Sequence, residues 1–387
     1  MEEQQNKDIC EGYDDILRNM PQIKDVIFLG AGASEGAPTQ NKLFEEFFKL
    51  SENDFDYDER EKYIEIRENL SNFFEFFFGI NVEKDSQFPT FEEVLGILEL
   101  SISNQETFQN FDTDHKDKKI QQIRQDLIFA MAIIIDKKLK NKGLFTRKLV
   151  NNLKKDPDDF LRTAFISLNY DILIDNALTE IYPDYDLDYG IDFTNFKLPQ
   201  NDEDKWERPC PSKSIQLYKP HGSLNWLYCP TCKSISLTPK SKGVATLRFK
   251  PKPCNECHTE MIPIIIPPTF FKDISNRYLE GIWYKTETML KQAENIYFCG
   301  YSFPDADIYI KYLFKRAEVN GKSDLNIYVV NRTITDELKQ RYERFFKNEI
   351  SFSAQTFEDF CENGFKYENN TKNSKKSTIS KVLHYNI

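Results

Sequence analysis

The sequence has no long hydrophobic run, no excess of basic residues and no pattern of a secretory leader. No uncharged stretch approaches the roughly 20 residues that a helix needs to cross a bilayer, and residues 1–8 are polar and acidic. The formal net charge of -11 gives no general attraction to nucleic acid or to an anionic membrane surface. We therefore expect a cytosolic protein that binds neither nucleic acid directly nor a membrane.

The cysteines do not form the pattern of a disulfide framework. Four of the eight occur in two Cys-x-x-Cys pairs, and the other four are scattered along the chain. This usage suits a reducing compartment and a metal site better than disulfides. The chain is nevertheless 40% hydrophobic and 14% aromatic over 387 residues, which is enough for a sizeable core in one large domain or two of ordinary size.

The two cysteine pairs have the spacing of a zinc ribbon. Cys229 and Cys232 are followed, after twenty-one residues, by Cys254 and Cys257. Four thiolates close a tetrahedral site and leave no open coordination position, so we expect a structural zinc ion and not a catalytic one. Lysine and arginine residues between and beside the pairs keep a nucleic-acid-binding ribbon open as an alternative.

A short apolar run at residues 25–29 stops at a glycine turn. Residues 30–34 read Gly-Ala-Gly-Ala-Ser. Glycines let the backbone approach a ligand closely, and free N–H groups at the start of a following helix can bind a pyrophosphate. The next glycine, Gly36, comes one position too late for the dinucleotide fingerprint, which disfavours a standard dehydrogenase. A tight strand-to-helix turn without a ligand explains these glycines equally well.

Two later apolar runs end in side chains capable of chemistry. The run 162–168 is followed by Asn169 and Asp171, and the run 214–218 is followed by His221 between a proline and a glycine. Ligands of open parallel sheets bind at strand ends, and imidazole titrates near neutral pH unaided. Capping of the next helix is an alternative for Asp171 that fits Asn169 less well. A lone histidine is more often structural, but its place at a strand end favours a chemical role here.

The strand-then-glycine pattern occurs again towards the end of the chain. The run 295–299 precedes Gly300 and Ser302, a second candidate for a phosphate cradle, and Asn331 follows the run 326–330. Ser302 also fits a turn residue, and for Asp307 we favour the role of a helix cap over ligand contact.

In their order along the chain, these motifs resemble those of the sirtuin family. The motifs are the glycine turn, Asn169 with Asp171, the His221-Gly turn, the four cysteines, Gly300 with Ser302, and Asn331. The resemblance implies an α/β fold with a Rossmann-like open, mainly parallel sheet, helices on both faces and a small zinc-binding module. It implies catalytic roles for Asn169, His221 and Asp171, with Asn169 holding the nicotinamide ribose and positioning the attacking water. It also implies NAD contacts from Gly30, Ala31, Gly32, Ser34, Gly300, Ser302 and Asn331.

Departures from the family pattern indicate one branch of it. The Pro-Asp-Phe-Arg stretch of deacylating sirtuins is replaced at residues 37–40, and their Phe-Gly-Glu strand is missing at residues 261–268. With the Leu-Asn-Tyr-Asp form at residues 168–171 and a long insertion, the chain looks like the sirtuin-like NAD hydrolases of bacterial antiviral defence. That resemblance implies NAD as a substrate cleaved to nicotinamide and ADP-ribose. It also implies a homo-oligomer or a separate sensor subunit such as a HerA-type ATPase or a short Argonaute.

Other functions remain open at this point. A protein deacylase or an ADP-ribosyltransferase would use the same site, and a non-catalytic sensor would bind NAD or ADP-ribose without turnover.

We expect one sirtuin-like domain over residues 23–366, between an N-terminal segment (1–22) and a polar tail (367–387). It would hold a helical insertion over residues 41–160 and a zinc module over residues 226–262. The insertion is predicted to form helices near residues 43–50, 59–78, 91–101, 120–140 and 144–155. The segment 182–208 is expected to be an irregular flap over the cleft.

Overall fold

A computed structural model describes residues 22–38, 42–85, 87–108, 116–139, 143–153, 160–194, 214–238, 247, 249–265, 277–305, 307–321 and 325–367. All but one residue of the expected N-terminal segment, and all but one of the expected tail, lie outside these ranges.

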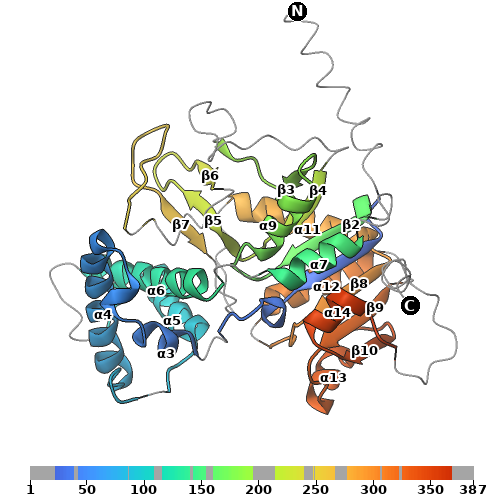
Figure 1. The fold of residues 1–387 in the computed structure, drawn as a ribbon, viewed down its shortest axis with the longest axis horizontal. Coiled ribbons are helices and arrows are strands. Elements are labelled where there is room, and N and C mark those ends of the chain that lie inside the picture. The colour runs from blue at the N-terminus through green and yellow to red at the C-terminus, as the bar shows by residue number, and fades with distance from the viewer. Residues whose placement is uncertain are drawn as a thin grey trace, which may run out of the picture.

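Within these ranges, seven parallel strands form the main sheet, in the order β10-β9-β8-β1-β2-β4-β3 (Figure 1). They are β1 (Asp25–Leu29), β2 (Thr163–Ser167), β3 (Asp186–Asp188), β4 (Ser214–Tyr218), β8 (Asn295–Cys299), β9 (Asn326–Asn331) and β10 (Ile350–Ala354). The central strands β1, β2 and β8 are buried at every position, which explains why they appear in the sequence as continuous apolar runs. The predicted open, mainly parallel sheet is confirmed.

Helices cover both faces of this sheet. On one face α7 (Leu144–Leu153) contacts α9 (Leu173–Ile181) and α14 (Phe357–Asn363), and on the other α11 (Arg277–Gln292) contacts α12 (Ile308–Asn320) (Figure 1). The helix α13 (Asp336–Glu343) contacts β10 at the sheet edge. None of the helices in the described part of the chain has the length and apolar character needed to cross a membrane.

A layer of helices lies beside the sheet, seen at the lower left of Figure 1. It contains α3 (Leu43–Phe48), α4 (Tyr57–Phe78), α5 (Phe91–Ser103) and α6 (Lys116–Leu139), close to the predicted ranges. A capping box between Thr90 and Glu93 starts α5, because each side chain bonds to the other residue's backbone N–H. The apolar side chains of these helices form a core separate from that of the sheet.

A small antiparallel sheet joins the two cores. It contains β5 (Gly222–Tyr228), β6 (Ile235–Leu237) and β7 (Ile262–Ile265), with β5 in the middle. Trp226 packs into the core of the main sheet, whereas Leu224 and Leu227 pack into the core of the helical layer. The side chains of β5 therefore hold the two layers together.

The described part of the expected flap, residues 182–194, is irregular except for one short strand. Asp186–Asp188 forms β3 and pairs with Ser214–Gln216 of β4 at the edge of the main sheet. The expectation was wrong here because Tyr185, Leu187 and Tyr189 alternate, and all three pack against the core of the main sheet. Residues 195–208 of the same segment lie outside the described residues.

Candidate functional site

A cavity of about 280 Å³ lies at the carboxyl ends of β1, β2 and β8. The strand order reverses at β1, since β2 lies on one side of it and β8 on the other. Ligands of open parallel α/β sheets bind at such a switch point. The helical layer supplies another wall through Leu43, Phe91, Glu92, Met131 and Ile135.

Most of the residues predicted to form a site come together in this cavity. Its lining includes Gly30, Ala31, Ser34, Asn169, Asp171, His221, Gly300 and Ser302. Two predicted residues, Gly32 and Asn331, do not line it. The side-chain oxygen of Asn331 instead accepts a hydrogen bond from the backbone N–H of Arg332 at 2.9 Å.

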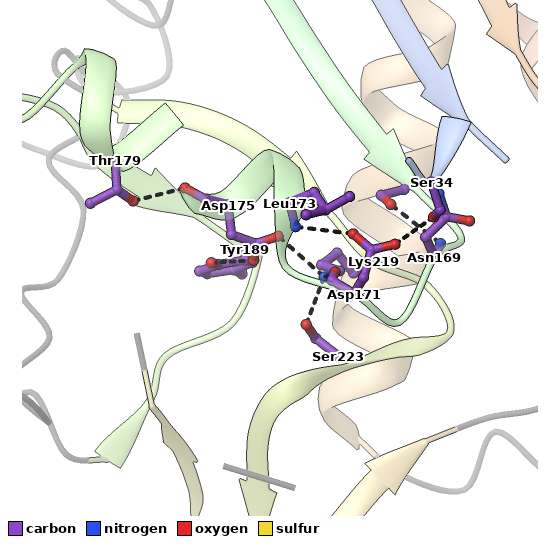
Figure 2. A network of polar contacts seen from close by, with 10 residues as sticks. Ser34, Asn169, Asp171, Leu173, Asp175, Thr179, Tyr189, Lys219 and Ser223 are labelled. Carbon is purple, nitrogen blue, oxygen red and sulfur yellow. Dashed lines mark hydrogen bonds and ion pairs between the residues drawn. The ribbon is translucent and has the colours of Figure 1, made fainter. Parts of the chain in front are cut away.

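The glycine turn holds Asn169 and Asp171 in place. The Asn169 Nδ2 donates to the Gly30 carbonyl at 2.9 Å, and the Ser34 hydroxyl donates to Asp171 Oδ2 at 2.5 Å (Figure 2). The other carboxylate oxygen, Oδ1, accepts from the backbone N–H of Leu173 at the start of α9. One oxygen of Asp171 therefore accepts from the first N–H of α9, although the N-cap position itself is Ile172. The bond from Asn169 Nδ2 leaves the amide oxygen as the side chain's acceptor.

A buried lysine connects the ends of β2 and β4 (Figure 2). The Lys219 side chain is fully buried, and its ammonium group donates to the Asp171 carbonyl at 2.6 Å, to the Ser223 hydroxyl at 2.6 Å and to Asp175 Oδ2 at 3.2 Å. The Tyr189 hydroxyl donates to the other Asp175 oxygen at 2.6 Å. These contacts use all three ammonium donors and give the buried cation an anionic partner.

Sequence reasoning missed Lys219, although a signal was available. A lysine directly after the apolar run 214–218 has no obvious access to solvent, so it needs a buried anion. Since Lys219 and Ser223 flank His221 along the chain, the same contacts fix the turn that carries the histidine relative to Asp171.

His221 lies in a tight turn between β4 and β5. The backbone N–H of Gly222 donates to the Lys219 carbonyl at 3.0 Å, and Gly222 has a φ of 87°. A Cβ on Gly222 would lie 2.1 Å from the Ile264 carbonyl oxygen, so only glycine fits. The His221 side chain is almost fully buried, and its Nε2 lies 4.0 Å from Asp307 Oδ1.

The two glycine turns pack directly on each other. The backbone N–H of Gly32 donates to the Gly300 carbonyl at 2.9 Å, and Gly300 has a φ of 63°. A Cβ on Gly300 would lie 2.4 Å from the Gly32 carbonyl carbon. Close approach of backbone to backbone therefore explains Gly32 and Gly300 without a ligand, while Gly30 and Gly300 also line the cavity.

Replacing Gly300 by alanine is expected to lower the free energy of unfolding by about 2 kcal/mol or more, because the new methyl group adds steric overlap to an unfavourable φ. Urea denaturation measures this change. Gly79→Ala is the matched control, since Gly79 also has a positive φ, but no heavy atom of the described residues lies within 4 Å of the point where its Cβ would stand. Equal losses in the two variants would contradict the packing argument.

The four predicted metal ligands lie together at the end of β5. The sulfur atoms of Cys229, Cys232, Cys254 and Cys257 all lie within 4.8 Å of one another. The Cys229–Cys257 and Cys232–Cys254 sulfur pairs are 3.4 and 3.5 Å apart. A tetrahedral zinc ion with bonds of about 2.3 Å needs sulfur atoms about 3.8 Å apart. The donor set and its dimensions therefore fit a structural zinc ion.

Without a metal the thiols of this group differ in acidity. Hydrogen bonding, first of all with the Thr259 side chain, lowers the pKa of the Cys257 thiol to about 6. Burial raises the pKa of the Cys229 thiol to about 11. Zinc binds thiolates, so occupancy of the site requires that the buried thiol also loses its proton.

Asp307 is a cavity residue whose role the sequence did not predict. It occupies the N-cap position of α12, as expected, but its side chain makes no capping hydrogen bond. Its carboxylate instead accepts from the Tyr301 hydroxyl at 2.8 Å and lies beside His221. The sequence predicted that Asp307 stands at the start of a helix, but it did not predict the contact with His221.

Comparison with known proteins adds one finding about this region. A model described as a SIR2-like domain matches residues 163–350. The matched region runs from the start of β2 to the start of β10, so it contains Asn169, His221 and the four cysteines. The glycine turn at residues 30–34 and the helical layer lie outside the SIR2-like region.

Solved structures of sirtuins also show similarity to most of the chain. They include "Structure of Sir2Tm bound to a propionylated peptide" (13% identity, 90% of this chain, 94% of that chain, TM-score 0.41) and "Sir2-p53 peptide-NAD+" (14% identity, 91% and 95%, TM-score 0.39). At TM-scores of this size, the similarity of these structures to the chain says nothing about the site. Among curated proteins, none matches the chain.

Proposed function

We propose that the protein is an NAD+ glycohydrolase that cleaves the nicotinamide–ribose bond to give nicotinamide and ADP-ribose. The observation that carries the proposal is that Asn169 and His221, 52 positions apart in the sequence, line one cavity at the switch point of the sheet. The match of the SIR2-like domain over both residues supports NAD as the substrate.

The charge of the cavity fits the cationic nicotinamide end of the substrate. Three carboxylate side chains, those of Glu92, Asp171 and Asp307, contribute to its lining. The nicotinamide ring of NAD+ carries a positive charge, and cleavage of its bond to ribose passes through an oxocarbenium-like transition state. Fixed negative groups stabilise positive charge that develops in a site from which water is excluded.

In the proposed reaction the Asn169 amide oxygen holds a water molecule next to the anomeric carbon. The bond between that carbon and the nicotinamide nitrogen breaks, and its electron pair neutralises the ring. The water oxygen forms the new bond to the anomeric carbon, and His221 accepts the proton that the water loses. Asp171 anchors the site through Ser34, while the turns at Gly30 and Gly300, whose residues line the cavity, bind the pyrophosphate.

The wider proposal concerns organisation and biological role. The four cysteines hold a structural zinc ion in a module over residues 226–262, within a sirtuin-like domain that contains the helical insertion. The resemblance of the motifs supports NAD depletion in antiviral defence, performed by a homo-oligomer or together with a separate sensor subunit such as a HerA-type ATPase. Native mass spectrometry of the chain co-expressed with its genomic neighbours tests this part.

The activity is tested by incubating the full chain with NAD+ and quantifying nicotinamide and ADP-ribose by chromatography. Asn169→Ala and His221→Ala are each expected to reduce kcat by about 10²- to 10⁴-fold, since each removes a group that acts in the transition state. Asn363→Ala, which changes an exposed asparagine in α14, is the control and should keep full activity.

The products distinguish the proposed hydrolase from the other functions. Acylated ADP-ribose would indicate a deacylase, and modified protein would indicate a transferase. Binding of NAD+ by calorimetry with no nicotinamide released, even with the co-expressed neighbours present, would indicate a sensor. Full activity in both Asn169→Ala and His221→Ala would refute the assigned site.

A further inference from the structure

We infer that Asp307 is the positioning residue for His221, orienting the imidazole and stabilising the imidazolium that forms when His221 takes a proton. The inference deepens the proposed function and depends on it for the chemical meaning of His221. The contact between the two side chains, however, is a property of the folded protein that can be measured without any reaction.

The first argument is the direction of the Asp307 side chain. An aspartate at an N-cap ordinarily accepts a hydrogen bond from a backbone N–H of the first helical turn, and loss of that bond costs about 1 kcal/mol. Asp307 makes no such bond and turns into the cavity. Its Oδ2 accepts from the Tyr301 hydroxyl at 2.8 Å, and its Oδ1 lies 4.0 Å from His221 Nε2.

The second argument is burial. The side chains of His221 and Asp307 are 3% and 4% exposed. An attraction between opposite charges is several times stronger in such surroundings than in water. A carboxylate within about 4–6 Å favours the charged form of a histidine, so Asp307 makes His221 a better proton acceptor.

The third argument is the arrangement of three groups in series. In catalytic triads a buried carboxylate orients a histidine that acts as the base. Here Tyr301 holds the carboxylate, and the carboxylate faces the imidazole. Burial raises the pKa of the Tyr301 hydroxyl well above its usual value, so that group stays protonated and donates. A separation of 4.0 Å is longer than a hydrogen bond, and such contacts often shorten only when substrate binds.

The experiment must distinguish the effect of Asp307 on His221 from the effects of the other charged or titratable groups nearby. Tyr170 faces the imidazole at 6.4 Å between ring centroids, and burial raises the pKa of its hydroxyl well above the usual value, which keeps it neutral. Asp171 and Glu92 line the same cavity, and Lys219 belongs to the same turn as His221. The substitutions below leave all four unchanged.

The direct test follows the imidazole by NMR during a pH titration of the apo protein. The chain has four histidines, so the His221 signal is assigned by its loss in His221→Ala. Asp307→Asn is expected to move the titration midpoint to lower pH by about one unit, because the imidazolium loses a neighbouring anion. Tyr301→Phe is expected to move it to higher pH, because the carboxylate charge is no longer shared with a hydroxyl.

The kinetic test uses the same variants. The base must be unprotonated, so the acid limb of the kcat/KM profile should move to lower pH in Asp307→Asn. In that variant kcat should fall about 10- to 100-fold while KM changes little, as for other groups that orient a catalytic residue. Asp305→Asn is the matched control, since Asp305 is 85% exposed and pairs with Lys311, and it should change neither profile.

The possible failures can be told apart. An unchanged His221 midpoint in both Asp307→Asn and Tyr301→Phe, with melting temperatures near that of the wild type, would overturn the inference whether or not NAD+ is cleaved. A changed midpoint in a protein that never releases nicotinamide would support the contact and refute the proposed function. If Asp307→Asn does not fold, Tyr301→Phe alone decides, because it keeps the aromatic ring and removes only the hydroxyl.

Discussion

Replacing Lys219 by methionine is expected to lower the free energy of unfolding by about 3–5 kcal/mol, the loss typical of removing one partner of a buried ion pair. Lys219 and Asp175 have side chains 0% and 3% exposed, so the remaining carboxylate cannot be compensated by water. The substitution also removes the hydrogen bonds that Lys219 donates to the Asp171 carbonyl and to Ser223. Urea denaturation followed by circular dichroism measures the change.

Two further variants show whether charge is the cause. In Lys219→Met with Asp175→Asn, the uncompensated charge is absent and most of the stability should return. Lys62→Met removes a lysine of an exposed ion pair with Glu65 and should cost less than about 1 kcal/mol. A double variant no more stable than Lys219→Met would disprove the electrostatic explanation. If the double variant is stable but has a reduced kcat, the result would show that Lys219 also positions the turn that carries His221.

Removal of zinc is expected to lower the free energy of unfolding by at least as much as the Lys219→Met substitution. Apparent binding free energies of structural zinc in small peptides are about 10–16 kcal/mol, and much of that energy contributes to folding. Cys229 and Cys254 are buried in the core of the helical layer, which also contains Leu227 of β5. Loss of the metal should therefore loosen the strand that joins the two cores, and the melting temperature should fall steeply when a strong chelator is added.

The zinc content of the purified protein and of a control variant tests this prediction. Metal analysis of the purified chain should find one zinc ion per chain, and Cys232→Ser should lose most of it. Cys361→Ala changes a buried cysteine outside the group of four and should leave the zinc content unchanged. A chain purified without chelator that contains no zinc, or a melting temperature insensitive to its removal, would contradict the assignment.

The predicted residues that lie close together in the structure are those that follow strands near the switch point. Asn169 and His221 follow β2 and β4. The apolar run of β2 is visible in the sequence because both faces of a parallel sheet are buried, and β4 is marked by Ile215, Leu217 and Tyr218. Parallel strands bring their carboxyl ends to one edge, so the proximity of these residues could be anticipated. Asn331 follows an equally clear apolar run, but β9 lies farther from the switch point and its end does not reach the cavity.

Contacts between distant segments could not be predicted. The packing of Gly32 on Gly300 was not foreseen, because a local pattern cannot reveal that two distant turns meet. Asp307 was assigned to a helix end because that is a common local use of the residue type. In both positions the tertiary neighbour determined the role.

By itself, the sequence determined the order of strands and helices, the cysteine quartet and the strand ends at which chemistry is expected. These features are encoded in periodicity and spacing over a few residues. Only the tertiary structure decided that the order reverses at β1, that Lys219 joins the ends of β2 and β4, and that Asp307 faces His221. The reason is that a buried charge or a turned side chain depends on partners far away along the chain, and no local pattern specifies them.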